Sequence, residues 1–547
     1  MAFSVRDNAI PDTVRGVTEW GRKPLPDDVR RHYVDAGYWT DASLGSMVAT
    51  GLAKSGGLGF TVNSKARPFT GTLGDIDRAA RAFATSLQAR GVGPGSVVVL
   101  QMPNWAEAGI AFWAAMYLGA VVVPIVHFYG PKEVRYILDV TQPDVVVIPE
   151  AFGVNRHVDM YAELPTAPNW LVVGDGTLPP RATRFADLLD AAPLDAPLPV
   201  DPDSPTLIGF TSGTTNNPKG VVHSHRTLGF EARQLNDMFP QIGPPQITGA
   251  PVGHFIGMLN AFITPLLRTY PVTLIDVWDP GEVLRMMVAD NLAAGGGATY
   301  FLTSLLDHPD FTDAHVAQMP FAGLGGSTVP LAVTERAEKL GIQVYRSYGS
   351  TEHPSITGSY LSDPVEKRMA TDGHVLEGVE IRLDPETGEI SSRGPDCCIG
   401  YTDPELTARV FDAEGWYATG DVGVLDDDGY LTITDRVSDI IIRGGENISA
   451  QEIEELMLGG VPNLAEVAVV AAPDERLGER AAAIMRLRDP SGTVPSLDDV
   501  RAHLQASGLT KQKWPESLHV VADFPRTPSG KVQKFRLRQQ LREGELS

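Results

Sequence analysis

The sequence predicts an α/β protein with two parts, a large first part built on a parallel sheet and a smaller α+β second part. Three observations favour this fold class: the length, an alternating pattern at 73–150, and a change of pattern near residue 430. A chain of 547 residues is too long for a single hydrophobic core. Helix-like and strand-like stretches alternate through 73–150, which is typical of a parallel sheet with helices on its faces. We place the boundary near Ser438, which gives domains 1–437 and 438–547.

The first expected elements lie in the alternating region. They are a helix in "IDRAARAFATSLQARG", a strand in "SVVVLQMP", and a helix followed by a strand in "EVRYILDVTQPDVVVIP". Between them, Ala108 to Val126 runs for nineteen residues without a charge, which is close to the length of a membrane span. Gly119 and Pro124 interrupt this segment, and no Lys or Arg flanks it closely. We therefore interpret it as a core helix that turns into a buried strand.

Further elements follow along the chain. Strands are expected in "TLIGF", "QVYRSY" and "GVEIRL". Near the boundary, "GYLTITDRVSDIIIRGG" indicates two short strands around a polar turn. Ser449 and Glu452 have the spacing of a capping box, which predicts that a helix begins there. The elements expected after it are strands in "AEVAVVAAP" and "AAAIMRLRD", a helix in "SLDDVRAHLQASG" and a strand in "SLHVVADFP".

Charge and cysteine content narrow the class of protein. The net charge of −23 argues against a nucleic-acid binder, because affinity for the phosphate backbone is mostly cationic. Cys397 and Cys398 are adjacent, which strains a disulfide between them, gives no metal-ligand spacing and favours a reducing compartment. The start, "MAFSVRDNAIPDTVRG", has no apolar signal region. We expect a cytoplasmic protein without a membrane span, and leave peripheral membrane contact and the oligomeric state open.

The stretch "FTSGTTNNPKGVVHSH" at 210–225 has the features of a phosphate-binding loop. Its glycines let backbone N–H groups turn towards an anion, its hydroxyls add donors, and Lys219 adds a positive charge. The Walker pattern requires Gly-Lys-Ser/Thr, whereas Pro218, Lys219 and Gly220 stand in its place. A GTPase-like function is therefore disfavoured. From this stretch alone, an ordinary polar surface loop stays the alternative.

Five motifs in order resemble those of the adenylate-forming, or AMP-binding, superfamily. The first, "TSGTTNNPKG", resembles the phosphate loop of acyl-CoA synthetases, of adenylation domains of peptide synthetases and of luciferases. The others are "SYGSTEH" at 347–353, "GWYATGDVG" at 415–423, "DRVSDIIIRGGENIS" at 435–449 and "PRTPSGKVQKFRLR" at 525–538. The resemblance is to the acyl-CoA synthetase or fatty-acid–CoA ligase type. It implies a large N-terminal AMP-binding domain of α/β subdomains plus a distorted β-barrel, with a small mobile α+β C-terminal domain.

The resemblance implies a site for ATP or AMP. Tyr348 would stack on adenine, and Asp421 would accept hydrogen bonds from the ribose hydroxyls. Arg436 would contact ribose or phosphate. Glu352 would be the magnesium ligand with Thr351 beside it, both with catalytic roles, since a hard cation prefers oxygen ligands. The residues implied for nucleotide binding are Thr211, Ser212, Gly213, Thr214, Thr215, Lys219, Gly326, Ser327, Tyr348, Gly349, Asp421 and Arg436.

The resemblance also implies functional residues in the second part. Lys531 matches the catalytic lysine that the family brings over the α-phosphate and the carboxylate. The alternative is a solvated lysine, because residues 524–542 carry six Lys or Arg and no acid. Ser438 stands at the hinge, where Asp or Lys is common, but a small residue can still absorb a large dihedral change. The residues that match the thioester loop for coenzyme A are Gly444, Gly445 and Glu446.

Two further stretches resemble the walls of the family's acyl pocket. "PVGHFIGM" at 251–258 points to His254, with a catalytic role, and to Phe255. "GLGGSTVP" at 323–330 resembles the strand edge between adenine and the acyl group, which adds Gly325. Alone, a histidine in an apolar stretch is more often structural, and the histidines at 223 and 225 are interpreted as incidental. Asn216 replaces the usual glycine of the phosphate loop, and asparagine tolerates left-handed backbone.

The implied reaction is the ATP-dependent ligation of a fatty or carbocyclic acid to coenzyme A. The acid would attack the α-phosphate of ATP to give an acyl adenylate and pyrophosphate, and a thiol would then displace AMP. ATP, Mg²⁺ and coenzyme A are the implied cofactors and co-substrates. Peptide-synthetase adenylation is disfavoured because 251–263 contain no Asp or Glu for an ammonium group. A stand-alone adenylation enzyme serving a carrier protein, a luciferase, and a nucleotide-binding regulator without catalysis stay alternatives.

Overall fold

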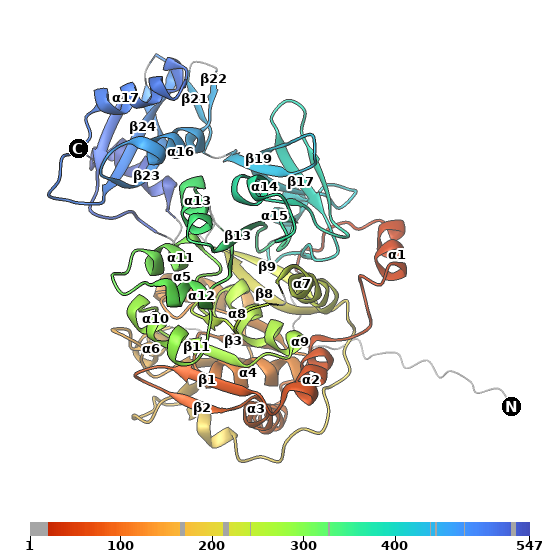
Figure 1. Ribbon diagram of the computed structural model, residues 1–547. Helices are drawn as coiled ribbons and strands as arrows, with labels where there is room; N and C mark the ends of the chain where they lie inside the picture. Colours follow the sequence, from red (N-terminus) through yellow and green to blue (C-terminus); the bar gives the residue numbers. More distant parts are fainter. Residues whose placement is uncertain are drawn as a thin grey trace.

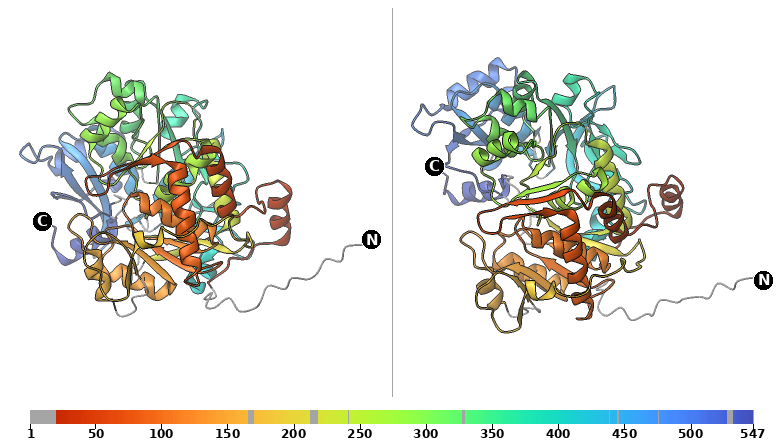
Figure 2. Two further views of the ribbon diagram at one scale, coloured as in Figure 1. Left: turned by 90° about the horizontal axis from the view of Figure 1, so that it is seen from below. Right: turned by 60° about the horizontal axis from the view of Figure 1, so that its bottom comes forward.

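The computed structural model covers most of the chain (Figures 1 and 2). Figure 1 shows the first part, coloured red to cyan, at the bottom, centre and upper right, and the last part, in blue, as a small unit at the upper left. The described residues are 20–164, 170–211, 218–240, 242–326, 329–437, 439–443, 446–474, 476–526 and 532–546, with the backbone alone at 446 and 447. Within these ranges, none of the helices is both long and apolar enough to cross a bilayer.

Eight of the described strands form a central sheet in the order β18-β9-β8-β4-β3-β5-β6-β7. Neighbouring strands are parallel from β8 to β7, and β9 runs antiparallel to β8 and β18. The parallel sheet expected from the alternating pattern is therefore confirmed. The strands are β3 (Val97–Leu100), β4 (Val121–Pro124), β5 (Val145–Pro149), β6 (Trp170–Val173), β7 (Ala182–Arg184), β8 (Pro205–Thr211), β9 (Lys219–Ser224) and β18 (Gly400–Tyr401).

Alternate residues of the central strands face two hydrophobic cores. Val98 and Val122 belong to the core that contains α3 and α4, whereas Val99 and Val123 belong to the core that contains α5 and α6. Because both faces are covered, the strands are continuous apolar runs. The helices in this part of the chain are α2 (Leu44–Ser55), α3 (Leu73–Gln88), α4 (Ala106–Tyr117), α5 (Pro131–Thr141), α6 (His157–Ala162), the 3₁₀ helix η1 (Phe185–Leu188), α7 (His225–Met238), α8 (Phe255–Phe262) and α9 (Thr264–Arg268).

The uncharged segment from Ala108 to Val126 forms α4 and then β4, as the sequence predicts. All residues of α4 except Glu107 are buried, which explains why the segment carries no other charge. Gly119 makes the turn between the two elements with a φ of 63°. A Cβ at this position would lie 2.2 Å from Cγ1 of Val200. The turn therefore requires glycine.

Two smaller mixed sheets have the orders β10-β11-β1-β2 and β12-β13-β14-β15. Since β12 and β13 are parallel, their carboxyl ends lie at the same edge. The strands are β1 (Gly59–Asn63), β2 (Phe69–Thr72), β10 (Ile247–Thr248), β11 (Val272–Ile275), β12 (Phe321–Gly325), β13 (Gln343–Tyr348), β14 (Thr357–Gly358) and β15 (His374–Val375). The helices in this region are α10 (Pro280–Ala289), α11 (Thr299–Leu306), α12 (Asp313–Gln318), α13 (Leu331–Lys339) and α14 (Val365–Ala370).

A further sheet is antiparallel, with the order β16-β17-β19-β20. In the described part of the chain its edge strands do not pair with each other, so the sheet is open where the resemblance implied a distorted β-barrel. Four strands have too little circumference to close around a filled interior. Its elements are β16 (Glu380–Leu383), β17 (Glu389–Arg393), α15 (Pro404–Val410), β19 (Tyr417–Leu425) and β20 (Leu431–Arg436).

The last sheet is centred on β24, which pairs with β23 along one edge and with β21 and β25 along the other. Ser449 caps α16 as predicted, because its hydroxyl accepts a hydrogen bond from the N–H of Glu452. The predicted capping box is incomplete, since the Glu452 carboxylate pairs with Nζ of Lys513 at 2.7 Å. The elements are β21 (Ile441–Arg443), β22 (Glu446–Ile448), α16 (Ala450–Gly460), β23 (Leu464–Asp474), β24 (Gly478–Leu487), α17 (Leu497–Ala506), η2 (Lys511–Lys513), β25 (Ser517–Val520) and α18 (Lys534–Glu543).

The first described residues run along the segment that leads into β18. The backbone N–H of Lys23 donates to the carbonyl of Ile399 at 2.7 Å, and its Nζ donates to that of Cys397 at 3.2 Å. Nε1 of Trp39 donates to the carbonyl of Pro395 at 2.9 Å. Between these contacts lies α1 (Asp27–Asp35). The N-terminal segment thus braces residues 395–399 from outside the central sheet.

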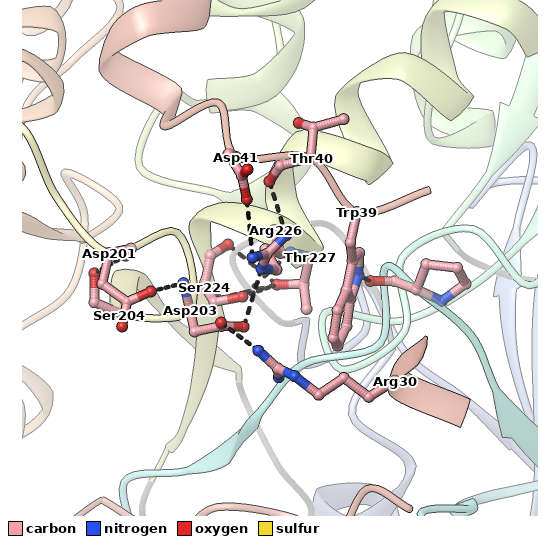
Figure 3. Close-up of polar contacts among 11 residues, drawn as sticks. Arg30, Trp39, Thr40, Asp41, Asp201, Asp203, Ser204, Ser224, Arg226 and Thr227 are labelled. Atoms are coloured by element: carbon pink, nitrogen blue, oxygen red, sulfur yellow. Dashed lines mark hydrogen bonds and ion pairs between the residues drawn. The ribbon is translucent and has the colours of Figure 1, made fainter. Parts of the chain in front are cut away.

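Arg226, in the first turn of α7, fastens this N-terminal segment to the large part (Figure 3). Its guanidinium donates to the carbonyl of Thr40 at 3.0 Å and forms ion pairs of 3.2 Å with Asp41 and Asp203. Asp203 also pairs with Arg30. The Arg226–Asp203 pair is shielded from solvent more than an ordinary surface pair, because its side chains are 11% and 25% exposed, whereas Asp41 is 95% exposed.

Candidate active site

The hairpin of β8 and β9 carries both ends of the expected phosphate loop. Thr211 and Lys219 are register partners across this hairpin, so a hydroxyl and a cation lie opposite each other at its end. The residues between them that the sequence assigned to phosphate binding lie outside the described residues: Ser212, Gly213, Thr214 and Thr215. Their roles stay predictions.

Thr351 packs against the hairpin of β8 and β9 that carries the expected phosphate loop, the phosphate hairpin. A Cβ at Gly209 of β8 would lie 2.9 Å from Cγ2 of Thr351, so glycine permits this close approach. Nε2 of His223 donates to the carbonyl of Thr351 at 2.7 Å, and Nδ1 lies 3.2 Å from the Thr227 hydroxyl. Burial lowers the pKa of His223 to about 4, so the ring is neutral at neutral pH. His223 has a structural role, because it holds the Thr351 backbone.

Glu352 is buried beside Thr351, with an exposed fraction of 7%. Its Oε1 accepts a hydrogen bond of 2.8 Å from the Tyr401 hydroxyl. Its backbone carbonyl accepts one of 2.7 Å from the N–H of Cys398. A carboxylate with one oxygen bonded in this way can offer the other to a hard cation.

Tyr348, Asp421 and Arg436 form a connected group. The Tyr348 hydroxyl donates to Oδ2 of Asp421 at 2.8 Å, and Nε of Arg436 pairs with Oδ1 at 2.7 Å. Burial and the Asp421 charge raise the pKa of Tyr348, and the same charge raises the pKa of Arg436. The phenol therefore stays a donor and the guanidinium stays charged. The structure brings together the three side chains that the sequence assigned to adenosine.

A buried ion pair fixes β13 relative to β20. Arg346 of β13 pairs with Oδ1 of Asp372 at 2.7 Å, and Oδ2 of Asp372 accepts a hydrogen bond of 2.9 Å from the N–H of Ile433 on β20. Both charged side chains are buried. Removing one partner would leave the other charge buried without compensation, so the pair holds the two strands in place. This sets the position of Tyr348 relative to Arg436.

Glycines surround the end of β13. A Cβ at Gly325 would lie 2.7 Å from the carbonyl oxygen of Ser347, and one at Gly349 would lie 1.9 Å from the carbonyl oxygen of Pro354. Gly326 has a φ of 75°, in the left-handed region that favours glycine. Glycine at 325 and 349 therefore lets neighbouring backbone segments pack closely at this edge, whereas nothing lies within 4 Å of the Cβ position of Gly326.

His254 and Phe255 lie at the start of α8. His254 is the N-cap residue and is half-buried. Gly253 brings it to the carboxyl end of β4, since a Cβ there would lie 2.3 Å from the carbonyl oxygen of Ile125. The ring of Phe255 packs on that of His223 with centroids 5.1 Å apart. The expected acyl pocket is thus in contact, through Phe255, with His223, which holds the Thr351 backbone.

Several residues that the sequence assigned to the site lie outside the described residues: Ser327, Ser438, Gly444, Gly445 and Lys531. Glu446 belongs to β22, where its backbone is the register partner of Arg443 in β21. Figure 1 shows the β21–β22 hairpin at the top of the small unit, away from β13. The roles of these residues stay predictions.

Comparison with known families decides the identity of the chain. The model of the AMP-binding enzyme family matches residues 62–402, more than half of the chain. The chain belongs to the AMP-binding enzyme family. A second model, of the AMP-binding enzyme C-terminal domain, matches residues 452–531. The predicted membership of the adenylate-forming superfamily is confirmed.

Relatives of this AMP-binding enzyme are CoA ligases. The medium-chain fatty-acid–CoA ligase of Escherichia coli (strain K12) is 34% identical over 532 residues, which cover 94% of this chain and 93% of the relative. The 3-[(3aS,4S,7aS)-7a-methyl-1,5-dioxo-octahydro-1H-inden-4-yl]propanoyl:CoA ligase of Rhodococcus jostii (strain RHA1) is 33% identical, covering 86% of this chain and 93% of the relative.

Solved structures share the fold of this AMP-binding enzyme. ATP-bound MatB from Rhodopseudomonas palustris has a TM-score of 0.79 at 26% identity, covering 91% of this chain and 98% of that protein. A fatty acyl CoA synthetase of Mycobacterium tuberculosis has a TM-score of 0.68 at 27% identity, covering 92% and 99%. The predicted fold class, with a large N-terminal and a small C-terminal part, is confirmed.

The side chains of this AMP-binding enzyme fit a magnesium ion that arrives with a nucleotide. Within the described ranges, no group of three or more His, Cys, Asp or Glu side chains could hold a metal by itself. Glu352 supplies one buried carboxylate with one oxygen bonded to Tyr401. Magnesium commonly binds one or two carboxylates together with substrate phosphates and water. This donor set therefore suits a magnesium–ATP complex.

Sequence reasoning missed two contacts in the site of this AMP-binding enzyme. His223 and Thr351 are 128 residues apart, and Tyr401 and Glu352 are 49 apart. Residues this far apart in the sequence form no recognisable motif, so the sequence does not indicate that they are in contact. Tyr401 lies on β18 and His223 on its neighbour β9 in the central sheet, and a short strand of two residues leaves almost no periodic pattern in the sequence.

Proposed function

We propose that this enzyme is an ATP-dependent carboxylic acid:CoA ligase that forms an acyl-AMP intermediate and releases AMP and pyrophosphate. The observation that carries the proposal is the convergence of three features at the end of β13. Tyr348 is bonded to Asp421, Thr351 packs on the phosphate hairpin, and the buried Glu352 follows at once. Groups suited to adenosine, phosphate and a cation thus lie along one turn of the chain.

The described side chains suggest how ATP binds. The ring of Tyr348 packs on adenine beside the open backbone of Gly326. Asp421 accepts hydrogen bonds from the ribose hydroxyls, and Arg436 contacts ribose or phosphate. Lys219 and the loop hydroxyls hold the β- and γ-phosphates. Only the α-phosphate then faces the acid.

The proposed reaction has two steps. First, a carboxylate oxygen attacks the α-phosphorus, the bond to the β-phosphate breaks, and pyrophosphate leaves. Lys531 offsets the negative charge that gathers on the α-phosphate, and His254 lies against the acyl group. A magnesium ion held by Glu352 supplies neutralisation of the leaving pyrophosphate. In the second step, the thiol of coenzyme A loses its proton and attacks the acyl carbon, and AMP leaves.

We also propose that the chain divides into domains 1–437 and 438–547, with the hinge at Ser438. The strand β20 ends at Arg436 and pairs with β19, whereas β21 begins at Ile441 and pairs with β22 and β24. The chain therefore changes sheets within a few residues of Ser438. Rotation there would carry the loop at 444–446 towards the adenylate and open a path for coenzyme A.

The substrate class is proposed as a fatty or carbocyclic acid. A partly open cavity of about 10 Å³ beside the His254 loop, room for about one water, is lined by apolar residues and Gly253, among them Phe112, Val252, Met258 and Phe262, and it would have to widen to hold an acyl group. An apolar lining favours an apolar acyl group, because a polar one would lose its hydration without compensation. The names of the relatives, which include medium-chain fatty acid and carbocyclic acid ligases, support the same class. We also propose a cytoplasmic enzyme of fatty acid or lipid metabolism.

Pyrophosphate exchange tests the first half-reaction. The enzyme, incubated with ATP, Mg²⁺ and labelled pyrophosphate, should return label to ATP only with an acid, and apolar acids should work best in a panel of short, medium, long, aromatic and alicyclic acids. The variant Lys531→Ala should lose this exchange yet still form thioester from supplied acyl adenylate and coenzyme A. Equal loss of both steps would contradict the proposed role of Lys531.

A separate experiment identifies the thiol that accepts the acyl group. Thioester should form when coenzyme A is added, and not when a phosphopantetheinyl carrier protein replaces it. Transfer to the carrier protein alone would favour a stand-alone adenylation enzyme. Absence of any acid-dependent exchange, with ATP still bound, would favour a nucleotide-binding regulator.

A further inference from the structure

Glu352 is held by two contacts that come from one edge of the central sheet. Its Oε1 accepts from the Tyr401 hydroxyl at 2.8 Å, and its carbonyl accepts from the N–H of Cys398 at 2.7 Å. Tyr401 is the register partner of Val221 in β9, the strand that also carries the predicted phosphate lysine. The position of the carboxylate relative to the phosphate hairpin is therefore set by main-chain pairing, which is stiff compared with a loop.

Tyr401 is buried, and both its ring and its backbone make close contacts. It is 1% exposed, and its ring packs near Phe411 with centroids 6.5 Å apart. Its backbone N–H donates to Oγ1 of Thr407 at 2.9 Å. The phenol O–H lies 2.8 Å from Oε1 of Glu352, and a carboxylate oxygen can only accept, so Tyr401 is the donor. A rigid donor at this place defines which oxygen of the carboxylate is engaged.

We propose that Tyr401 is a positioning residue that holds Oε1 of Glu352 so that Oε2 is presented to the magnesium–ATP complex. The inference rests on the proposed role of Glu352 as the magnesium ligand. A hydrogen bond to one oxygen stops the carboxylate from rotating about its last bond, and magnesium demands a nearly ideal arrangement of its ligands. Loss of the hydroxyl would leave the charge of Glu352 but free its orientation.

The direct test is metal binding, measured without turnover. The variant Tyr401→Phe removes the hydroxyl and keeps the ring. Free Mn²⁺ is titrated by electron paramagnetic resonance with the enzyme and the non-hydrolysable analogue α,β-methylene-ATP. We expect the dissociation constant of Mn²⁺ to rise about tenfold, at the lower end of the effect of losing a partner of a metal ligand.

A matched control separates positioning from loss of a buried hydrogen bond. Tyr161 is also fully buried, and its hydroxyl donates to Oε1 of Gln101 at 2.9 Å, away from the site. Tyr161→Phe should lower the melting temperature but leave Mn²⁺ affinity unchanged. If Tyr401→Phe folds and binds Mn²⁺ as tightly as the control, the inference is overturned.

A second variant shows whether a lower Mn²⁺ affinity of Tyr401→Phe comes from the lost donor or from a folding defect. Replacing Tyr401 with p-aminophenylalanine keeps a donor at the same distance, so the Mn²⁺ affinity should return towards that of the unaltered enzyme. An affinity as low as that of Tyr401→Phe would show that the donor is not what matters, and would contradict the inference.

The double variant distinguishes this inference from the proposed role of Glu352. Glu352→Gln alone should weaken Mn²⁺ binding, and adding Tyr401→Phe to it should change little, because the two residues act as a unit. If Glu352→Gln does not weaken binding, the magnesium role itself fails. If Glu352→Gln weakens binding and Tyr401→Phe does not, only the positioning role fails. In the exchange assay, Tyr401→Phe should raise the Mg²⁺ requirement and leave KM for the acid unchanged.

Discussion

The hydroxyl of Tyr348 donates a hydrogen bond of 2.8 Å to Oδ2 of Asp421, while Arg436 holds Oδ1 at 2.7 Å. One carboxylate thus joins an aromatic ring on β13 to a cation on β20. Each carboxylate oxygen can accept more than one hydrogen bond, so Asp421 keeps capacity for the two ribose hydroxyls. The side chains proposed to bind adenosine are therefore arranged by contacts within the protein itself.

Asp421→Asn should weaken AMP binding. The amide keeps the shape but loses the charge that orients Arg436 and strengthens the hydrogen bonds to ribose. Hydrogen bonds to a charged group contribute about 1.5–3 kcal/mol, so the dissociation constant of AMP should rise about 10–100-fold. Isothermal titration calorimetry with AMP measures it. Asp427→Asn, an identical change at an exposed turn residue close by, should have no effect, and equal effects of the two changes would contradict the role of Asp421.

Glu231→Gln should stabilise the enzyme increasingly as the pH rises. Burial, with the nearby charge of Asp396, raises the pKa of Glu231 well above 4.5, and its Oε1 accepts from the hydroxyl of Ser355 at 3.1 Å. The folded state therefore keeps a proton that the unfolded state releases, so stability falls as the pH rises from about 4.5 through the folded pKa. Glutamine cannot titrate.

Melting temperatures at about pH 5 and about pH 8 check this prediction, because the change of stability follows the proton uptake. The difference between Glu231→Gln and the unaltered enzyme should be larger at the higher pH. Glu366→Gln, at an exposed position on α14, should show no such trend. A constant difference for Glu231→Gln would mean that this carboxyl has the same pKa in the folded and unfolded states, and would contradict the raised pKa.

Acid should destabilise the enzyme partly through His223. Burial lowers the pKa of His223 from 6.5 to about 4. Its contribution to stability is full above 6.5 and is lost as the pH falls towards 4, by about 3 kcal/mol in total. His223→Leu should lower the melting temperature at neutral pH, since the Thr351 carbonyl loses its donor, and the deficit should shrink towards about pH 4.5. A deficit that stays constant would mean that the ring has the same pKa in the folded and unfolded states, and would contradict the lowered pKa.

Gly119→Ala should destabilise the enzyme more than Gly429→Ala. Both glycines have positive φ, 63° and 84°, so each alanine costs about 1–2 kcal/mol of backbone strain. Only at Gly119 would the new Cβ clash, 2.2 Å from Val200, whereas nothing lies within 4 Å at Gly429. Overpacking adds about 1–3 kcal/mol. Urea unfolding of both variants compares the two effects, and equal losses would show that the neighbourhood of Val200 yields easily.

Much of the fold follows from local patterns in the sequence. The run from Ala108 to Val126 could be interpreted because Gly119 and Pro124 break it at the point where the helix gives way to a strand. The helix start at Ser449 could be predicted because a cap is a contact within one turn. The choice of partner for Glu452 could not, since Lys513 reaches it only after the small part has folded.

Part of the candidate site also follows from the local sequence, and part of it does not. Tyr348, Thr351 and Glu352 stand in one motif, so their proximity is a property of the local sequence. Their supports are not local, because Tyr401 reaches Glu352 through the pairing of β18 with β9. Register of this kind depends on the whole sheet. For the same reason, the open antiparallel sheet could not be told in advance from a closed one.

The hydrogen bonds of Lys23 and Trp39 to residues 395–399 have a consequence for the order of folding. During synthesis the beginning of the chain emerges first and must wait until about four hundred residues have followed before its partners exist. Long-range contacts of this kind form late. The cation side of the site would thus be completed only when the two ends of the large part meet, so a nascent chain would bind nucleotide poorly until that moment.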